Sequence, residues 1–359
     1  MSDVLVGMSG GIDSSVAASI LLGQGHTVRG VTMSLWKEGR AFHGDMTKDA
    51  CFSPNKEEEI RKAAAVCAAL GIQHTVLDIS DLYESTVLRN FRDEYLSGRT
   101  PNPCIWCNPI IKFGAMVDYA RTAGLKFDFF ATGHYARIEN RGGRLCLMRG
   151  ADPLKDQSYF LYRLSQAQLS RTLFPLGNMT KKAVRAIDVR LGLHSADQDE
   201  SQDFYSGPYS DLLDVEPAPG DIVDTSGRVL GHHNGAWNYT IGQRRGLGIA
   251  APNPLYVIGL DIKANRVIVG EANLARCTLV KASQINWVSL PGPEALATPL
   301  RASAKVRSTG SPAPGTVCME GALLSFRFDE PVLSPACGQS LVIYDNDSIL
   351  CGGIIEYAG

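Results

Sequence analysis

Two short segments of the chain carry residue types that could do chemistry. The first is Ser9-Gly10-Gly11-Ile12-Asp13-Ser14, which follows a short apolar run and precedes a helical pattern. Two glycines let backbone N–H groups converge, and the start of a helix adds partial positive charge, so the loop is expected to bind an anion. Ser9 and Ser14 could donate hydroxyl hydrogen bonds, and Asp13 could hold a metal ion that screens phosphate charge.

The spacing in this loop excludes two common phosphate-binding motifs. The chain contains no Gly-Lys dipeptide, so the loop is not a Walker A motif, and the segment lacks the G-x-G-x-x-G spacing of a dinucleotide fingerprint. A generic strand-to-helix turn also favours Gly, Asp and Ser, but S-G-G-x-D-S is a sharper string than turn composition. We therefore predict an anion-binding loop made of Ser9, Gly10, Gly11, Ile12, Asp13 and Ser14.

The second segment is the C-x-x-C pair formed by Cys104 and Cys107. Prolines on both sides of Asn102 predict an extended, rigid approach, and the thiols stand just before an expected helix at residues 110–123, whose dipole would lower their pKa. The spacing admits a zinc half-site, a redox disulfide, two ligands of an iron-sulfur cluster, or a sulfur carrier with a resolving partner. Zinc is the least favoured, because no second C-x-x-C or matching His pair completes four ligands.

Composition sets the class of protein that must position these residues. The chain has 359 residues, which suggests two or three domains, and 45% hydrophobic with 20% charged residues is ordinary for a folded protein. The formal charge of -2 neither supports nor excludes a nucleic-acid partner. We expect a cytoplasmic protein with no membrane partner, because no apolar run is long enough for a bilayer span and no signal peptide is recognisable. The nine cysteines are then thiols, ligands or catalysts.

The N-terminal part of the chain alternates between strand and helix patterns. Such alternation predicts an α/β domain with a doubly wound parallel sheet whose ligands bind at the carboxyl ends of the strands. A basic helical stretch begins at Ser165, and short β-branched runs separated by turns follow Pro217. We predict an α/β domain at residues 1–164, a small helical linker at 165–216, and an all-β C-terminal domain of one or two barrels at 217–359. The expected strands are 4–8, 27–35, 73–77 and 127–132, and the expected helices are 56–70, 82–96 and 110–123.

Further motifs make the chain resemble known families. The loop string resembles the PP-loop ATP pyrophosphatase superfamily, whose members adenylate an oxygen of their substrate. Over nearly its whole length the chain resembles the tRNA-specific 2-thiouridylase family. The segments that carry this resemblance are Gly7–Ser14, Asn102–Phe113, Ala131–Arg137, Lys155–Leu161, Phe174–Gly177, Tyr239–Gly248 and Gly338–Gln339.

The resemblance implies that residues 1–164 are the ATP-binding catalytic domain and that the linker at 165–216 contacts tRNA, and it implies a role for individual residues. Gly7 to Ser14 would bind the phosphates of ATP with Mg²⁺, and Met33 and Gly133 would border its adenosine. Cys107 falls where the family has its nucleophile, with Cys104 and Asp13 as the other catalytic candidates. The positions implied to contact tRNA are Asn102, Pro103, Cys104, His134, Lys155, Asp156, Gln157, Arg307, Ser308 and Gln339.

The chain departs from the family at the second catalytic cysteine. Tyr205 stands where the family has a persulfide-carrying cysteine, and Cys104 stands where it commonly has Asp. In one route Cys104 and Cys107 act as a pair, one holding the persulfide and the other resolving it. In a second, slightly favoured route they ligate a [4Fe-4S] cluster with Cys51 as third ligand. Cys67 lies in an Ala-rich helical stretch typical of a core.

The implied reaction is ATP-dependent 2-thiolation of the wobble uridine, position 34, of tRNA. Adenylation makes O2 a leaving group, and a sulfur borne by cysteine or by a cluster attacks C2. The implied partners are the anticodon stem-loop and a sulfur-donor protein or sulfide. The alternatives are another PP-loop adenylating ligase or amidating enzyme acting on a small molecule, and a non-catalytic tRNA-binding iron-sulfur module.

Three weaker features keep two interpretations each. The loop Gly242–Gly248 contains Arg244 and Arg245 and is either a phosphate contact or only a basic turn. The cluster Lys181, Lys182 and Arg185 is either a tRNA contact or a solvated helix face. Trp106 could shield the thiols or stack on a base, and core packing is the equal alternative.

Overall fold

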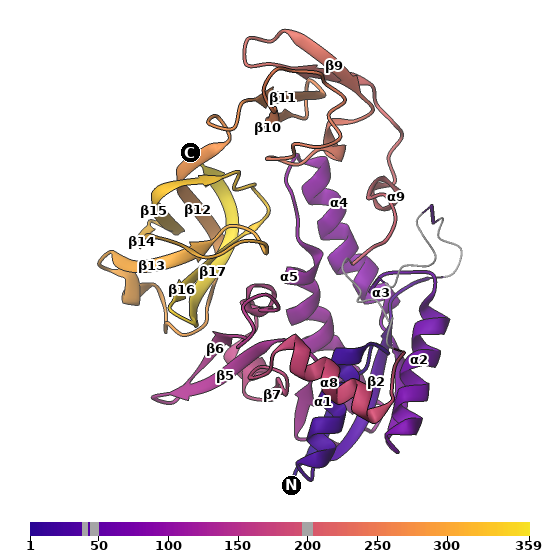
Figure 1. Cartoon of the computed structure of the whole chain (residues 1–359). Helices are drawn as coiled ribbons and strands as arrows, with labels where there is room; N and C mark the ends of the chain where they lie inside the picture. The colour runs from indigo at the N-terminus through magenta and orange to yellow at the C-terminus, as the bar shows by residue number, and fades with distance from the viewer. Residues whose placement is uncertain (38–41, 44–49, 196–203) are drawn as a thin grey trace. The chain divides into compact units, whose positions relative to one another are not determined.

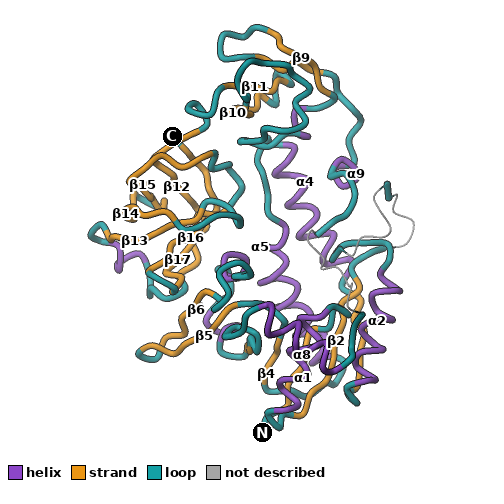
Figure 2. Tube along the Cα trace, viewed as in Figure 1, coloured by secondary structure: helices purple, strands orange, loops and turns teal. Residues whose placement is uncertain are grey.

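The structure is a computed structural model that describes residues 1–37, 42–43, 50–195 and 204–359. By their internal contacts they form two compact units (Figures 1 and 2). The first unit comprises Met1–Val87, Cys104–Pro208 and Asp347–Ile349, and the second comprises Leu88–Pro103, Tyr209–Asn346 and Leu350–Gly359. The segment predicted as a linker, 165–216, is therefore divided between them at Pro208.

A parallel five-stranded sheet forms the centre of the first unit. Val4, Leu5 and Val6 in the central strand have no exposed surface, as expected for a strand covered on both faces. The doubly wound α/β prediction is confirmed. The strand order is β3-β2-β1-β4-β7, with β1 at Asp3–Gly7, β2 at Thr27–Ser34, β3 at Gln73–Asp78, β4 at Phe129–Ala131 and β7 at Thr172–Leu173.

Helices pack against this sheet and against one another. Helix α1 (Ile12–Gly23) places Val16 and Ala17 in a buried cluster with Val184 of α8 (Lys181–Leu191). Helix α2 (Lys56–Ala69) buries Ala63, Val66 and Cys67 in another cluster with β1, which confirms Cys67 as a core residue. The remaining elements of this unit are α3 (Ser80–Tyr83), a π-helix at Glu84–Leu88, α5 (Pro103–Cys107), a π-helix at Asn108–Ala115, α6 (Met116–Thr122), β5 (Ala136–Arg141), β6 (Arg144–Arg149), a 3-10 helix at Ser158–Leu161 and α7 (Gln166–Leu169).

The helix that follows the cysteine pair begins earlier than predicted. We expected it to start at Ile110, but helical structure begins at Pro103 and continues through the cysteines. Proline is tolerated in the first helical turn because its missing N–H has no partner there. Pro109 cannot donate to the preceding turn, and the chain widens into the π-helix Asn108–Ala115 at this point.

The second unit holds the C-terminal strands in two sheets. One has four strands in the order β10-β11-β8-β9, and the other contains a closed barrel in the order β12-β15-β14-β13-β16-β17, with β12 also pairing with β17. The all-β prediction for this part of the chain is confirmed. The elements are α4 (Arg89–Leu96), α9 (Ser210–Leu213), β8 (Gly220–Val223), β9 (Val229–His233), β10 (Tyr256–Asp261), β11 (Arg266–Gly270), β12 (Arg276–Trp287), β13 (Leu300–Lys305), β14 (Ala313–Glu320), β15 (Leu323–Leu333), β16 (Ser340–Asp345) and β17 (Ser348–Ala358), with 3-10 helices at Ala236–Asn238 and Pro293–Leu296.

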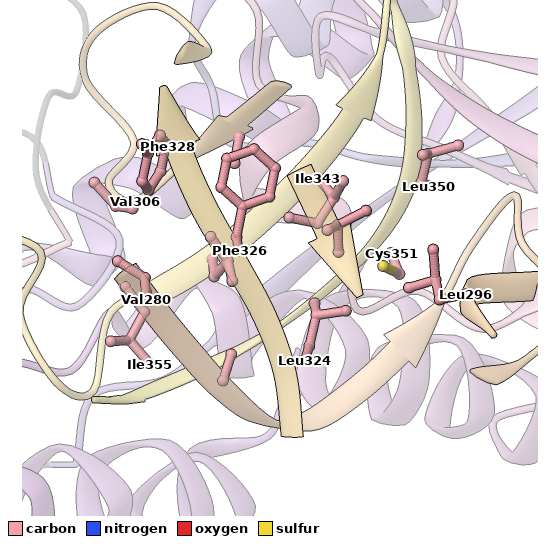
Figure 3. Packing of buried hydrophobic residues seen from close by; sticks show 14 residues of the cluster. Val280, Leu296, Val306, Leu324, Phe326, Phe328, Ile343, Leu350, Cys351 and Ile355 are labelled. Atoms are coloured by element: carbon pink, nitrogen blue, oxygen red, sulfur yellow. The ribbon is translucent and has the colours of Figure 1, made fainter. Parts of the chain in front are cut away.

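The barrel interior is filled by apolar side chains (Figure 3). Phe326 and Phe328 point inward from β15, and their ring centroids lie 4.6 Å apart. Closure leaves the barrel without an exposed sheet edge. Within the described ranges of the chain, no helix has both the length and the apolarity that a bilayer span requires.

Candidate functional site

The glycine loop lies between the end of β1 and the start of α1, as predicted. Gly10 has φ +77°, and a Cβ on it would lie 2.9 Å from the Cβ of Lys62. The hydroxyls of Ser9 and Ser14 lie 3.2 Å apart, and Ser14 Oγ donates to the carbonyl of Gly11 at 3.0 Å. The loop is therefore a tight turn closed by its own hydroxyls at the carboxyl edge of the sheet, where α1 begins.

The adenosine-bordering candidates stand at the same edge. Met33 lies near the end of β2, which pairs with β1, the strand that leads into the loop. The Met8 N–H, just after β1, donates to the Val31 carbonyl of β2 at 2.8 Å. Gly133 follows β4 and lies against the loop itself: a Cβ on it would be 2.6 Å from the carbonyl carbon of Asp13 and 2.8 Å from the nitrogen of Ser14. Both positions fit a nucleotide site at this edge, and their contact with adenosine stays a prediction.

Replacing Gly133 by alanine is expected to distort the loop and weaken ATP binding by at least about tenfold, because the added methyl meets backbone atoms that cannot rotate away. Gly23→Ala is the matched control, since a Cβ at the end of α1 meets nothing within 4 Å. Calorimetric titration of both variants with ATP, alongside thermal unfolding, measures the difference. Wild-type ATP affinity in folded Gly133→Ala protein would show that the loop does not need this close approach.

Asp13 is held by two donors from later parts of the chain. Tyr135 OH donates to Asp13 Oδ1 at 2.8 Å, and Lys181 Nζ lies 2.8 Å from the same oxygen. A carboxylate fixed at the start of α1 is a suitable ligand for Mg²⁺. Lys181 thus faces the loop and is not simply a solvated residue, whereas tRNA contact by Lys182 and Arg185 stays a prediction.

The cysteine pair lies on the helix that precedes β4. Cys104 is partly exposed, Cys107 is 8% exposed, and none of the nine cysteines is in a disulfide. The π-helix after them is held by Gln168, whose Nε2 donates to the carbonyls of Pro109 at 2.7 Å and Phe113 at 3.2 Å. The helix is thereby fixed in a wide turn directly beyond the thiols.

The predicted lowering of the thiol pKa is wrong for Cys107. Burial raises the pKa of Cys107 to about 12, although the charge of Lys112 acts in the opposite direction. Burial lowers the pKa of Lys112, but the neighbouring cysteines Cys51, Cys107 and Cys104 raise it, and the net shift is upward. The helix start is a weaker influence than loss of solvent here. Cys107 is therefore a protonated thiol with a cation beside it.

The described side chains give no evidence for an iron-sulfur cluster. Cys51, Cys104 and Cys107 are all described, and in the described part of the chain no three His, Cys, Asp or Glu side chains converge as metal ligands. Cluster irons need thiolates within bonding distance of one centre. The structure gives no support to the cluster route, and no step is assigned to it.

Tyr205 belongs to an aromatic core. It is 2% exposed, and its ring centroid lies 5.6 Å from that of Phe42 and 6.2 Å from that of Phe52. Phe52 in turn stacks on Tyr83 at 5.3 Å, and its N–H donates to the Phe204 carbonyl at 2.8 Å. A packing side chain has therefore replaced the thiol that the family resemblance implied. The rest of that segment, 200–203, lies outside the described residues.

Four of the predicted tRNA-contacting residues lie together in the first unit. His134 Nδ1 is 2.7 Å from Thr132 Oγ1, and burial together with the charge of Lys112 lowers the pKa of His134 well below its ordinary value, so the ring is neutral. Asp156 accepts from the N–H groups of Gly150 and Ser158 at 3.1 Å each, and Gln157 Oε1 accepts from the Tyr135 N–H at 2.9 Å. These bonds shape the segment that also holds Lys155. Contact of His134, Lys155, Asp156 and Gln157 with tRNA stays a prediction.

The other predicted tRNA contacts lie in the second unit or at its border. Gln339 Nε2 donates to the carbonyls of Thr100 at 2.9 Å and Pro101 at 3.3 Å, so it holds the chain that leads into Asn102 and Pro103. Arg307 and Ser308 lie in the turn between β13 and β14. The structure thus brings Gln339 to the Asn102 segment, while tRNA contact by all five residues stays a prediction.

Sequence reasoning missed several side chains that complete the site. Lys112 lies five residues after Cys107, and only packing reveals that Cys51, Cys107 and Cys104 all act to raise its pKa. The Arg163 guanidinium lies 4.2 Å from the Trp106 ring centroid, a cation–π contact that the sequence does not signal. His194 contacts the Gly10 carbonyl at 3.1 Å from a position 184 residues away. None of these partners follows from local spacing.

Comparison with known proteins agrees with this arrangement. Three family models match in order: a tRNA methyl transferase HUP domain at residues 2–205, a tRNA methyl transferase PRC-barrel domain at 213–271 and an aminomethyltransferase beta-barrel domain at 277–355. The chain is 44% identical to the tRNA-specific 2-thiouridylase MnmA of Endomicrobium trichonymphae, covering 98% of each chain. It is 46% identical to the same enzyme of Trichormus variabilis, covering 99% of each, and 43% identical to that of Geobacter metallireducens, covering 99% of this chain and 97% of the relative. The chain belongs to the tRNA-specific 2-thiouridylase family.

Proposed function

We propose that this protein is a tRNA-uridine 2-sulfurtransferase that uses ATP to replace the C2 oxygen of uridine by sulfur. The observation that supports this function is that neighbouring residues of the first unit connect the phosphate loop to the thiols. Gly133 lies against Asp13 of the loop, and the next residue, His134, feels the charge of Lys112, which also acts on Cys107. An adenylating site beside a thiol pair suits sulfur transfer better than ligation or amidation, for which the thiols would have no role.

The first step activates the base. Uridine O2 attacks the α-phosphorus of ATP, the bond to the β-phosphate breaks, and pyrophosphate leaves with the electron pair. The loop N–H groups and the start of α1 stabilise negative charge on the phosphates. Mg²⁺ beside Asp13 would screen that charge when bound. The base then carries AMP on O2, which is a good leaving group at C2.

The second step transfers sulfur through the cysteine pair. Cys104 is the more exposed thiol, so it accepts a sulfane sulfur from a donor and carries it as a persulfide. The terminal sulfur attacks C2 and AMP leaves with the C–O electron pair. Cys107 then loses its proton and attacks Cys104 Sγ; the bond to the transferred sulfur breaks, and thiouridine leaves with the electron pair and takes up a proton. A Cys104–Cys107 disulfide remains, and a dithiol reductant restores both thiols.

The substrate assignment rests on the family. Wobble uridine 34 in an anticodon stem-loop is the target that the family name and the motif match support, with a cytoplasmic sulfur-donor protein or sulfide as the second partner. The segment Asn102–Pro103, fixed in part by Gln339, would hold the target base next to Cys104, its neighbour in sequence.

One assay tests the function against its alternatives. Unmodified tRNA, ATP, Mg²⁺, a dithiol and a persulfide donor are incubated with the protein without oxygen, and 2-thiouridine and AMP are quantified by mass spectrometry. We expect one AMP for each thiouridine, with both dependent on tRNA. AMP formed without tRNA would favour a small-molecule ligase, and tRNA binding with neither product would favour a non-catalytic module.

A further inference from the structure

Helix α8 and the residues after it contact the glycine loop at two points that the proposed reaction does not yet use. At the start of the helix, Lys181 Nζ lies 2.8 Å from Asp13 Oδ1. Beyond its end, His194 Nε2 lies 3.1 Å from the Gly10 carbonyl oxygen and 3.5 Å from Ser15 Oγ. The loop is thus held from both ends of one helix.

Backbone hydrogen bonds at the start of α8 hold Lys181 in position. The helix begins with Thr180 as its cap, whose hydroxyl accepts from the Ala183 N–H at 3.3 Å, and the Lys181 N–H donates to Asp152 Oδ2 at 2.9 Å. The Lys181 side chain is 15% exposed and that of Asp13 31%, so the pair is partly shielded from water. Shielding a lysine ammonium from water costs free energy unless the ammonium has a partner of opposite charge.

The other contact fixes where α8 ends. Asp188 is 1% exposed, and its Oδ1 lies 2.6 Å from His194 Nδ1. His194 therefore stands between a buried carboxylate and the Gly10 carbonyl. Together with the shared apolar cluster of α1 and α8, this fixes the position of α8 on α1 and hence that of Lys181 at the loop.

The loop needs a cation that it does not contain. Residues Gly7 to Ser14 include one carboxylate and no basic residue, while the triphosphate of ATP carries several negative charges. Backbone N–H groups and a helix start supply only partial charges. Asp13 is the loop's candidate ligand for the metal ion that would accompany ATP, so a cation beside Asp13 would stand next to the phosphates that leave.

From this geometry we propose that Lys181 binds the β- and γ-phosphates of ATP, and that Asp13 and Tyr135 hold it in place before the nucleotide arrives. The inference rests on ATP use in the proposed function. With ATP bound, Asp13 would hold Mg²⁺, and the Lys181 ammonium would move from Asp13 to the phosphates and stabilise the negative charge of the departing pyrophosphate.

Equilibrium binding to the full-length protein tests this. Lys181→Met is expected to weaken Mg-ATP binding roughly 10- to 100-fold, the range of one charge-assisted contact, and to change AMP binding by less than about threefold. Lys181→Arg should retain most of the affinity for ATP because it keeps the charge. Lys182→Met is the matched control, since Lys182 is exposed on the same helix turn.

The outcomes separate phosphate binding from a merely structural role. Equal losses for ATP and AMP, or a lower melting temperature with unchanged ATP affinity, would mean that Lys181 only shapes the loop and would overturn the proposal. Wild-type ATP affinity in Lys181→Met would overturn it as well. Because the measurement needs no tRNA and no sulfur, its result does not depend on whether the protein thiolates tRNA.

Discussion

In a single turnover without a dithiol, Cys107→Ser protein is expected to release no 2-thiouridine above background, at least about 10³-fold less than the unchanged protein releases, while it still releases pyrophosphate from ATP in the presence of tRNA. A serine hydroxyl cannot attack a disulfide sulfur, so resolution of the transferred sulfur stops. The phosphate loop has no contact that depends on this thiol, so adenylation continues.

The variant should also trap an intermediate. Without Cys107, Cys104 stays linked to the transferred sulfur on C2, which gives a covalent protein–tRNA adduct that a dithiol releases as thiouridine. Cys104→Ser should give no adduct, because no persulfide forms. Denaturing gel electrophoresis with and without dithiothreitol measures both.

Cys51→Ser is the matched control for these two variants, since Cys51 lies in the same neighbourhood without an assigned step. It should keep its activity within about twofold. Full activity in Cys107→Ser would remove this thiol from the reaction, and loss of activity in Cys51→Ser would reveal a third thiol in the relay.

The elements that could be predicted from sequence are those whose evidence is local. Val4 to Met8 followed by S-G-G-x-D-S predicts strand, loop and helix, because an apolar run, two glycines and a helical period lie within about twenty residues. The early start of the helix at Pro103 could not be predicted in this way, because proline usually indicates a helix end, although the first helical turn tolerates it.

The parts of the site that were missed depend on packing between distant segments. Lys181 shares a basic cluster with Lys182, and only the fit of α8 against α1 decides that the first faces Asp13 while the second faces solvent. The same holds for the pKa of Cys107. A helix start at the cysteine pair suggests a lowered value, but the extent of burial comes from residues that sequence spacing does not place.

The raised pKa of Cys107 makes a second large effect testable. At pH 8 a thiol with a pKa of about 12 has roughly 10³-fold less thiolate than one with an ordinary pKa near 9, so iodoacetamide should label Cys107 about 10³-fold more slowly than the same cysteine in unfolded protein. The labelling rate should rise about tenfold for each pH unit from 7 to 10. Peptide mass spectrometry of timed, quenched samples gives the rate for each cysteine.

The raised pKa of Cys107 also sets how the stability of the fold depends on pH. Because folding raises the pKa of Cys107, its neutral form favours the folded state fully below about pH 9, and this contribution is lost as pH rises toward 12. Lys112→Met removes the cation that favours the thiolate, so it should slow labelling further at every pH. Faster labelling in Lys112→Met, or Cys107 labelling at the unfolded rate, would show that the thiol is already activated before tRNA binds. Slow labelling that tRNA and ATP accelerate would instead place activation of Cys107 after substrate binding. Late activation would protect the thiol from unproductive reactions.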